Sequence, residues 1–596
     1  PAELRDLEPL SQEITVADWK KGFSVWKEST STSPSGRNLS IYKALLSCRT
    51  ITADLCEILN IILRLQLIPS RWCKAITVLI EKDPGNPCIN RLRMIHLFEA
   101  DFNFFLKLMW ASRLMHRGED HKQFGVQQYG SRARMCALDP SMMKRLTYDL
   151  TRQQRSNLAT FDNDAKSCYD RIVNPIAMLA SQRLGMSPSS ISVHAGVLRA
   201  MKYTIKTKYG VSTTYTQSTA ASPLFGTGQG SGASPAIWLA ISVVLLSSLS
   251  RLIPRGMKFE SPSQHIVLGR LSDSFVDDTQ NGINDAHLKQ PMSLSHLIRN
   301  LEAMAQTWER LLFSSGGALE PSKCFYSVVY WHWIKGLPTM TPVSEMTHVP
   351  PIKLTSGFDI STGLSGPPTI IKQADPKSSN KSLGIFQATT GDDKEQFTSL
   401  QGSSNRIAGL VNTSNLTKTE AYIAYRFCYT PAMTYSMGTT TLSPSFLRSI
   451  AMYAESTFLS RMGFNRHFPR AATYGPLEFG GLALTDLSTE QGVMQIKTLL
   501  EIVYHGTEIG KMIMVSLHTL QMEAGTSALI LTDLSHDLPY LTECWLTSLR
   551  RFMYINNISL EFADAWNHRL TRNHDSFIMD KFSETQYSTA ELRNLN

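Results

Sequence analysis

Residues 157–170 read NLATFDNDAKSCYD and combine a candidate strand with several acids. Residues 157–161 (NLATF) predict a strand that leads into a cluster of acids. Carboxylates beside an apolar strand are costly unless a positive charge neutralises them, and lysine, arginine or a metal ion can supply that charge. A site built only from oxygen ligands favours a hard cation such as Mg²⁺.

Two further segments continue this pattern downstream. Residues 226–235 read GTGQGSGASP, a glycine-rich turn that ends in Pro235 at the start of an apolar helix, where proline is well suited. Residues 266–283 predict two strands joined by a turn, with Asp277 and Asp278 at the centre. Alone, the first signal is typical of a helix-capping loop and the second of a solvated turn. A third carboxylate from a distant strand end would instead complete a two-metal site for phosphoryl transfer.

In this order, the three segments resemble the reverse transcriptases of non-LTR (LINE-like) retrotransposons. That family carries D-x4-[FY] in one strand, G-x-P-Q-G-S-x-x-S-P before a helix, and [FY]-x-D-D in a hairpin. This sequence matches with Asp164 and Tyr169, and then with the two downstream segments. Gly228 stands where the family usually has proline, which should loosen the turn. Shorter matches lie at 81–95, 128–132, 316–323 and 381–384, so the resemblance covers about residues 35–500.

The resemblance implies an α+β fold of the right-hand polymerase type. It assigns an N-terminal extension and the fingers to residues 1–150, and a ferredoxin-like palm with the catalytic motifs to 151–335. An insertion loop and the primer-grip region follow in 336–384, then a mainly helical thumb in 385–505 and a helical C-terminal extension in 506–596. Residues 336–380 are rich in proline, serine, glycine and threonine, which predicts a long surface insertion.

The resemblance also implies which residues carry the reaction. Asp164 and Asp277 are expected to bind two Mg²⁺ ions, with Mn²⁺ as an alternative metal, and Asp278 is expected beside them as a supporting metal-site carboxylate. Lys323 is expected to be the general acid toward the departing pyrophosphate, and the ordinary alternative is a structural lysine.

A nucleotide-binding set follows from the same resemblance. Tyr169 is expected under the sugar, where an aromatic ring excludes a 2′-hydroxyl, unless it is a core tyrosine beneath the sheet. Arg93 and Lys82 are expected to hold the triphosphate, although either one alone reads as a surface cation. The full expected set of nucleotide contacts is Lys82, Arg93, Tyr169, Gln229, Gly230 and Val276.

Several neighbouring residues fall outside the family pattern. Asp162 and Asp273 are expected to be surface or supporting acids, and Asp170 is expected to form a structural salt bridge. Trp331 and Trp333 are expected in the core rather than as base-stacking residues.

Composition narrows the class of protein. The chain has 59 Lys and Arg against 50 Asp and Glu, a net charge of +9 that is compatible with a polyanionic partner. Its 9 cysteines form no CxxC pair, which favours a reducing intracellular compartment, nucleus or cytoplasm, over a disulfide framework or zinc cluster. The apolar run at 235–249 is shorter than a membrane span and contains serines, so we expect a buried helix and no membrane. The chain starts at Pro1 without an initiator methionine, so we expect a fragment of a longer reading frame.

The predicted function is therefore that of an RNA-directed DNA polymerase that uses an RNA template, a DNA primer or target DNA, and dNTPs. An RNA-directed RNA polymerase is one alternative, because Asp164 to Asp170 also reads as D-x5-D. Tyr169, the Gln229-Gly230 turn and the lack of a glycine before Asp277 argue against it. An inactive RNA-binding scaffold is the other alternative, although all three carboxylates are present. The host, the template preference and the oligomeric state stay open.

Overall fold

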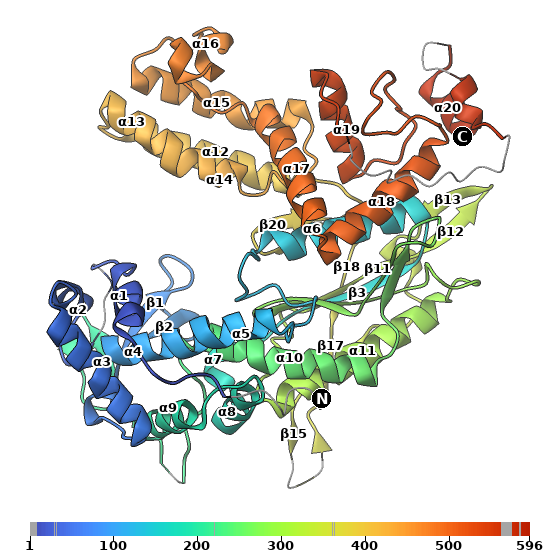
Figure 1. Cartoon of the computed structure of the whole chain (residues 1–596). Helices are drawn as coiled ribbons and strands as arrows, with labels where there is room; N and C mark the ends of the chain where they lie inside the picture. Colours follow the sequence, from blue (N-terminus) through green and yellow to red (C-terminus); the bar gives the residue numbers. More distant parts are fainter. Residues whose placement is uncertain are drawn as a thin grey trace.

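The structure is a computed structural model that describes residues 9–28, 30, 33–219, 221–359, 362, 364–561, 575–582 and 586–595. Helices account for 48% of the chain and strands for 15%, so the predicted combination of helices and sheets is confirmed. Figure 1 shows an N-terminal lobe below a helical lobe, with both extending from a central sheet.

The N-terminal lobe packs helices against a five-stranded sheet. The strand order is β2-β1-β4-β5, β6 also pairs with β4, and β1 runs parallel to β4. Trp19, Phe23 and Phe104 contact one another in its core, with ring centroids 4.7–5.0 Å apart. The elements are α1 (Val16–Ser24), α2 (Leu39–Leu45), α3 (Arg49–Arg64), η2 (Ser70–Cys73), β1 (Lys74–Glu81), η3 (Ile89–Arg91), β2 (Leu92–Leu97), α4 (Ala100–Leu106), η4 (Lys107–Leu114), α5 (Met115–Asp120), α8 (Asn174–Arg183), α9 (Pro188–Ala200), β4 (Lys202–Thr207), β5 (Gly210–Val211) and β6 (Thr216–Gln217).

The central sheet has the strand order β18-β11-β3-β10-β9. Its four main strands follow one another along the chain as β3, then helices, then the hairpin β9–β10, then α11 and β11. Helices α10 and α11 cover one face and α6 covers the other (Figure 1). The elements are α6 (Leu138–Gln154), β3 (Leu158–Asp164), α7 (Cys168–Arg171), α10 (Ser234–Leu252), β7 (Met257–Glu260), β8 (Val267–Arg270), β9 (Ser272–Phe275), β10 (Asp278–Asn284), α11 (Leu294–Ser314), β11 (Phe325–Val329) and β18 (Lys372–Ala374).

The segment predicted as a surface insertion is more ordered than the sequence suggested. It forms short strands, and β18 joins the central sheet parallel to β11. Scattered apolar residues explain the difference, because Ile352, Leu354, Ile371 and Ala374 are 0–3% exposed and belong to buried clusters or sheet positions. The elements are β12 (Trp331–Ile334), β13 (Leu337–Met340), η5 (Val343–Glu345), β14 (Lys353–Thr355), β15 (Phe358–Asp359), β16 (Leu364–Ser365), β17 (Pro368–Ile370), β19 (Asn380–Ser382) and β20 (Ile385–Gln387).

The chain beyond residue 385 is mainly helical, as predicted. The helical lobe has its own apolar core, whereas the C-terminal helices share a core with α6 and the β7–β8 hairpin. The helical lobe contains α12 (Lys394–Thr413), α13 (Lys418–Ala424), η6 (Tyr425–Tyr429), α14 (Thr430–Thr434), α15 (Pro444–Met462), α16 (Arg470–Tyr474), η7 (Leu477–Phe479) and α17 (Leu487–Tyr504). The C-terminal segment contains α18 (Glu508–Ala524), α19 (Trp545–Asn556), η8 (Ile578–Lys581) and α20 (Thr589–Leu595).

Helix α10 contains the apolar run that raised the question of a membrane span. Among the described residues it is the one helix long and apolar enough to cross a membrane. The core helix of a soluble protein can be equally long and apolar. In α10, 56% of the most apolar 18-residue stretch is buried inside the protein. Its contacts with α8 and α11 are those of the buried helix that the sequence predicted.

Candidate active site

Three carboxylates meet at one end of the central sheet. Strands β3 and β10 pair antiparallel, and their register sets Asp278 directly opposite Asp164. Asp277 lies in the two-residue turn between β9 and β10, and its carbonyl accepts the backbone N–H of Ala165 (3.3 Å). Strand β3 runs on through Asp164, so that carboxylate stands on the strand rather than in a following loop.

The turn that carries Asp277 has an unusual backbone. Val276 has φ +60°, a left-handed conformation that is rare for a β-branched residue and costs free energy unless the surroundings enforce it. The indole N–H of Trp238 donates to the Val276 carbonyl. A Cβ on Gly130 would lie 2.5 Å from the Val276 backbone nitrogen, so only glycine permits this approach. Residues from two other segments therefore hold the turn in place.

Burial and neighbouring negative charge raise the pKa of both Asp277 and Asp278. Burial first, and then the charges of Asp277 and Asp164, raise the pKa of Asp278 to about 6. Burial and the charge of Asp164 also raise the pKa of Asp277, against the opposing charges of Lys323 and Arg93. Such crowding of like charges is relieved by a bound cation.

Lys323 is the cation nearest to Asp164. Its ammonium group forms an ion pair with the Asp164 carboxylate, and the Asp164 carbonyl accepts the backbone N–H of Glu320 (3.0 Å). The hydrogen bond with Asp164, followed by the charges of nearby acids, raises the pKa of Lys323 despite partial burial. Lys323 is therefore protonated at neutral pH.

The oxygen ligands of the site suit a hard divalent cation. Within the described parts of the chain, no three His, Cys, Asp or Glu side chains lie close enough together to enclose a metal ion as they stand. Asp164, Asp277 and Asp278 nevertheless offer only oxygen ligands, and their mutual repulsion is what a divalent ion would remove. The oxygen chemistry of these residues fits Mg²⁺ or Mn²⁺, and a bound ion would compete with Lys323 for the Asp164 carboxylate.

The glycine-rich turn lies against strand β2. His96 donates its backbone N–H to the Gln229 carbonyl (2.6 Å), and a Cβ on Gly230 would lie 2.3 Å from the His96 carbonyl oxygen. Gly228 has φ +78°, which proline cannot adopt. Its carbonyl accepts the Ser234 hydroxyl (2.9 Å), so the glycine belongs to a defined turn rather than a merely loosened one.

Tyr169 lies beside this turn. Its carbonyl accepts the backbone N–H of Thr227 (2.9 Å), and its half-buried ring packs on the main core. The predicted salt bridge of Asp170 is wrong, because no ion pair among the described residues involves this carboxylate. Burial raises the pKa of Asp170, a hydrogen bond from the Gln229 backbone lowers it, and Lys82 acts only through its charge. The Asp170 carboxylate therefore accepts a hydrogen bond from the backbone of the turn and forms no ion pair with a neighbouring cation of the described chain.

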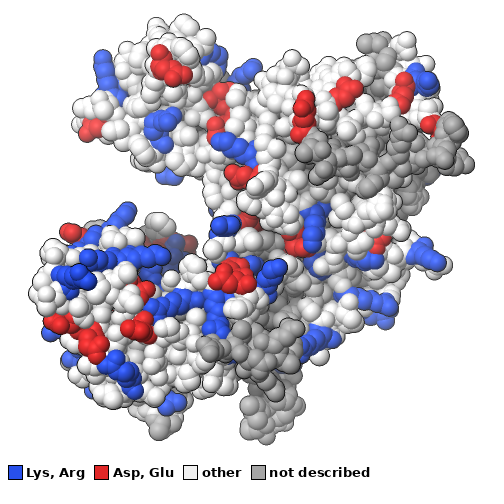
Figure 2. All heavy atoms as spheres, in the orientation of Figure 1, with Lys and Arg blue, Asp and Glu red and all other residues white. Residues whose placement is uncertain are grey.

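Arg93 and Lys82 lie at the edge of this arrangement. Both are exposed on the N-terminal sheet, Arg93 in β2 and Lys82 just after β1. The charge of Arg93 lowers the pKa of Asp277, as that of Lys82 does for Asp170. The structure therefore places both cations within electrostatic range of the acids but in contact with none of the three predicted metal ligands. Figure 2 shows blue Lys and Arg side chains along the hollow between the two lobes.

Sequence reasoning missed a buried lysine beneath the carboxylates. Lys144 of α6 forms an ion pair with Asp162 (2.6 Å), and Gln280 donates to both oxygens of Asp162 (3.1 Å each). Asp162 precedes Asp164 by two residues and therefore shares its face of β3. That alternation could have located Asp162, but no motif pointed to Lys144. A pocket of about 330 Å³ is lined by Pro140, Ser141, Lys144, Asp162, Asn163, Asp164, Asp273, Phe275, Asp278, Thr279, Gln280, Lys323, Phe325, Lys381, Ser382 and Leu383.

Two acids and two tryptophans outside the motifs lie near this region or next to the central sheet. Asp162 and Asp273 are not surface acids, because both are buried and paired, Asp273 with Arg270. Both line the same pocket as Asp164 and Asp278, and a supporting role there stays a prediction. Trp331, predicted in the core, is half-buried against a buried cluster, whereas the prediction for Trp333 is wrong, since it is 64% exposed on the β12–β13 hairpin.

Comparison with known proteins adds no assignment: no family model matches the chain, and no curated protein matches it.

Proposed function

We propose that the protein is an RNA-directed DNA polymerase of the non-LTR retrotransposon type. The observation that carries the proposal is the meeting of Asp164, Asp277 and Asp278 at one end of the central sheet. Tyr169 and the turn at 226–230 lie next to one another, since the Thr227 N–H donates to the Tyr169 carbonyl. Each of these segments carries one of the family's three motifs.

The topology supports the proposal. The order β11-β3-β10-β9 with a β-α-β-β-α-β path corresponds to a ferredoxin-like arrangement, which the resemblance implies for a palm. The N-terminal lobe then corresponds to the fingers and the helical lobe to the thumb. Strand β19 carries Lys381 and Ser382, which line the pocket beside Asp164 and Asp278. This is where a primer-grip segment would need to lie.

The proposed reaction is attack of a primer 3′-hydroxyl on the α-phosphorus of a dNTP. The hydroxyl loses its proton to water as its oxygen bonds to the α-phosphorus, the bond between the α-phosphorus and the oxygen bridging to the β-phosphorus breaks, and pyrophosphate leaves. Asp164 and Asp277 would hold the divalent ions, with Asp278 beside them. When bound, such ions stabilise the charge on the attacking and leaving oxygens of an in-line displacement.

The chain's own residues would position and neutralise the substrates. Lys323, protonated at neutral pH, would give a proton to the departing pyrophosphate. Arg93 and Lys82 would hold the triphosphate from the N-terminal lobe. Gln229, Gly230 and Val276 would line the nucleotide, while the ring of Tyr169 would occupy the space of a 2′-hydroxyl. The last point favours dNTPs over rNTPs, and thus a reverse transcriptase over an RNA polymerase.

Primer extension by the whole chain tests the proposal. The assay uses an oligo(dT) primer on poly(rA) with Mg²⁺, and compares dTTP with UTP. We expect dTTP incorporation that Asp277→Asn/Asp278→Asn abolishes, and that the exposed-acid control Asp54→Asn/Asp120→Asn leaves unchanged. Extension with UTP alone would indicate an RNA polymerase. RNA binding without any extension would indicate a scaffold.

A further inference from the structure

One region of the chain has an extreme charge composition. Residues 171–259 contain no Asp or Glu but nine Lys or Arg, as many as the net charge of the whole protein. Three of the nine cations, Lys202, Lys206 and Lys208, lie on β4 or in the turn that follows it. Arg199 ends the helix that leads into the same strand. Lys202, Lys206 and Lys208 thus form a local group of cations within a region that has no acid.

Strand geometry places these lysines on one face of the sheet. Lys202 and Lys206 are four residues apart, so their side chains leave β4 on the same side. The parallel pairing of β1 and β4 sets Lys74 beside Lys202 and Val78 beside Lys206. All four lysines, Lys74, Lys202, Lys206 and Lys208, are exposed, and none forms an ion pair within the described chain. We call them, together with Tyr209, the β4 face.

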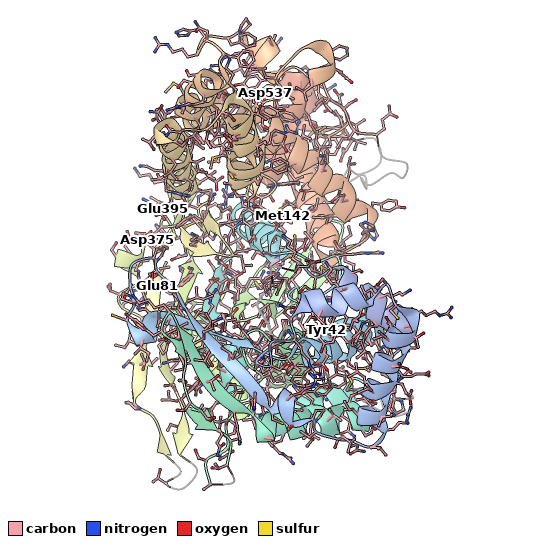
Figure 3. The ribbon with its side chains drawn as sticks, turned by 90° about the vertical axis from the view of Figure 1, so that its left-hand side faces the viewer. Tyr42, Glu81, Met142, Asp375, Glu395 and Asp537 are labelled. Carbon is pink, nitrogen blue, oxygen red and sulfur yellow. The ribbon has the colours of Figure 1, made fainter. Side chains whose placement is uncertain are left out.

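The surface around these lysines is apolar rather than acidic. The same side of β1 carries Ile76 and Val78, which are half-buried, and Ile80, which is 51% exposed. Tyr209 at the hairpin tip is 88% exposed, with the Lys208 ammonium 4.9 Å from its ring centroid. Glu81, labelled in Figure 3 at the end of β1, is the single acid in the strands of this sheet.

We infer that the β4 face binds single-stranded nucleic acid and, given the proposed function, guides the unpaired part of the template. Lysines that lack acidic partners attract a phosphate backbone without reading its sequence. Exposed aliphatic and aromatic side chains between them suit unpaired bases, which can pack or stack on such surfaces. A duplex would offer these side chains only phosphates and groove edges. The face also continues the sheet that carries Arg93 and Lys82, so a strand leaving the acids would cross it.

A binding measurement on the full chain tests this inference without requiring catalysis. Fluorescence anisotropy would follow a labelled 20-nucleotide oligo(rU) at several KCl concentrations. The test variant is Lys202→Gln/Lys206→Gln/Lys208→Gln. The matched control is Lys20→Gln/Lys21→Gln/Lys27→Gln, which removes the same charge from exposed positions elsewhere in the N-terminal lobe.

The two variants should behave differently. Three lost phosphate contacts should reduce the slope of log affinity against log salt by about 2, and affinity should fall roughly tenfold or more near 0.1 M salt. The control should keep the slope within experimental error. Tyr209→Ala should weaken binding severalfold without changing the slope, because stacking releases no counterions. An equal loss in both triple variants, or no loss in the β4 triple, would overturn the inference.

Primer extension separates this inference from the proposed function. With templates of 3 and 25 unpaired nucleotides, the β4 triple should raise the KM for the long overhang alone. If the unmodified chain extends no primer, the proposed polymerase fails, while the anisotropy result still decides whether the β4 face binds RNA. If binding to vesicles with anionic lipid depends on these lysines and RNA binding does not, the face serves a membrane and the inference is wrong.

Discussion

His194 shows how one buried side chain can determine the response to acid. It lies in α9 with no exposed surface, its ring 4.7 Å from that of Trp110, and neither ring nitrogen has a hydrogen-bond partner among the described residues. Burial lowers its pKa from 6.5 to about 3. The unfolded chain therefore binds the proton first, so the stability from neutral His194 is complete above pH 6.5. It is lost progressively as pH falls toward 3.

We predict that His194 lowers the free energy of unfolding by about 2 kcal/mol when the pH falls from 7 to 5. His194→Leu should remove that part of the pH dependence, whereas exposed His121→Gln should leave it intact. Urea unfolding at both pH values measures the difference. An unchanged pH dependence in His194→Leu would show that His194 is neither buried nor neutral as described.

Tyr169 carries the proposed preference for deoxynucleotides. Its ring is half-buried beside the turn at 226–230, and its removal opens the space that the proposal assigns to the 2′-position. Tyr169→Ala should lower the ratio of kcat/KM for dTTP over UTP by about tenfold or more, a change of about 1.4 kcal/mol. Tyr169→Phe keeps the ring and should keep the ratio. A core role alone would reduce both activities together and leave their ratio unchanged.

The conformation of the turn at 226–230 explains why Gly228 stands where the reverse transcriptase pattern usually has proline. Gly228 has φ +78°, and its Cβ would lie 2.9 Å from the His96 ring. Gly228→Pro should therefore displace the turn and lower kcat/KM for dNTPs by about tenfold or more. Exposed Gly402→Ala in α12, where a Cβ meets nothing within 4 Å, should instead stabilise the protein by about 0.5–1 kcal/mol. Normal activity in Gly228→Pro would mean that the turn adopts another conformation.

The elements differ in how far the sequence could predict them. The continuous apolar run at 235–249 predicts α10, whereas β3 and the β9–β10 hairpin are expected from the turn pattern around their acids. All three lie at the expected positions. The strands between 336 and 380 are two or three residues long in most cases, too short for a periodic signal. The contact of Lys144 with Asp162 depends on how α6 lies across the sheet. No local pattern encodes that placement.

At the scale of the whole molecule, α6 joins the central sheet, the helical lobe and the C-terminal segment through one buried charge cluster. Arg145 donates to Asp393 (2.8 Å) just before α12, and Asp393 also accepts the backbone N–H of Thr441 (2.8 Å). One turn along α6, Asp149 accepts the backbone N–H of Trp545 (2.7 Å) at the start of α19. The side chains of Arg145, Asp149 and Asp393 are 3%, 1% and 7% exposed. The sequence showed none of this, because partners more than 240 residues apart share no motif.

Breaking this cluster should loosen the whole assembly. Removing one partner of a buried ion pair leaves the other charge uncompensated, so Arg145→Met should cost about 3–5 kcal/mol. The control Glu543→Gln breaks the Arg551–Glu543 pair, whose side chains are 48% and 66% exposed, and should cost less than about 1 kcal/mol.

Arg145→Met/Asp393→Leu removes both charges and should recover part of the loss, because neither partner stays buried alone. Urea unfolding measures all three free energies. Since the cluster anchors the helical lobe to the sheet that carries the acids, Arg145→Met should also shorten primer-extension products more than it lowers single-nucleotide addition. Equal costs for Arg145→Met and Glu543→Gln would show that the cluster does not hold the lobes together. A shortened product with unchanged stability would instead assign Arg145 to nucleic-acid contact.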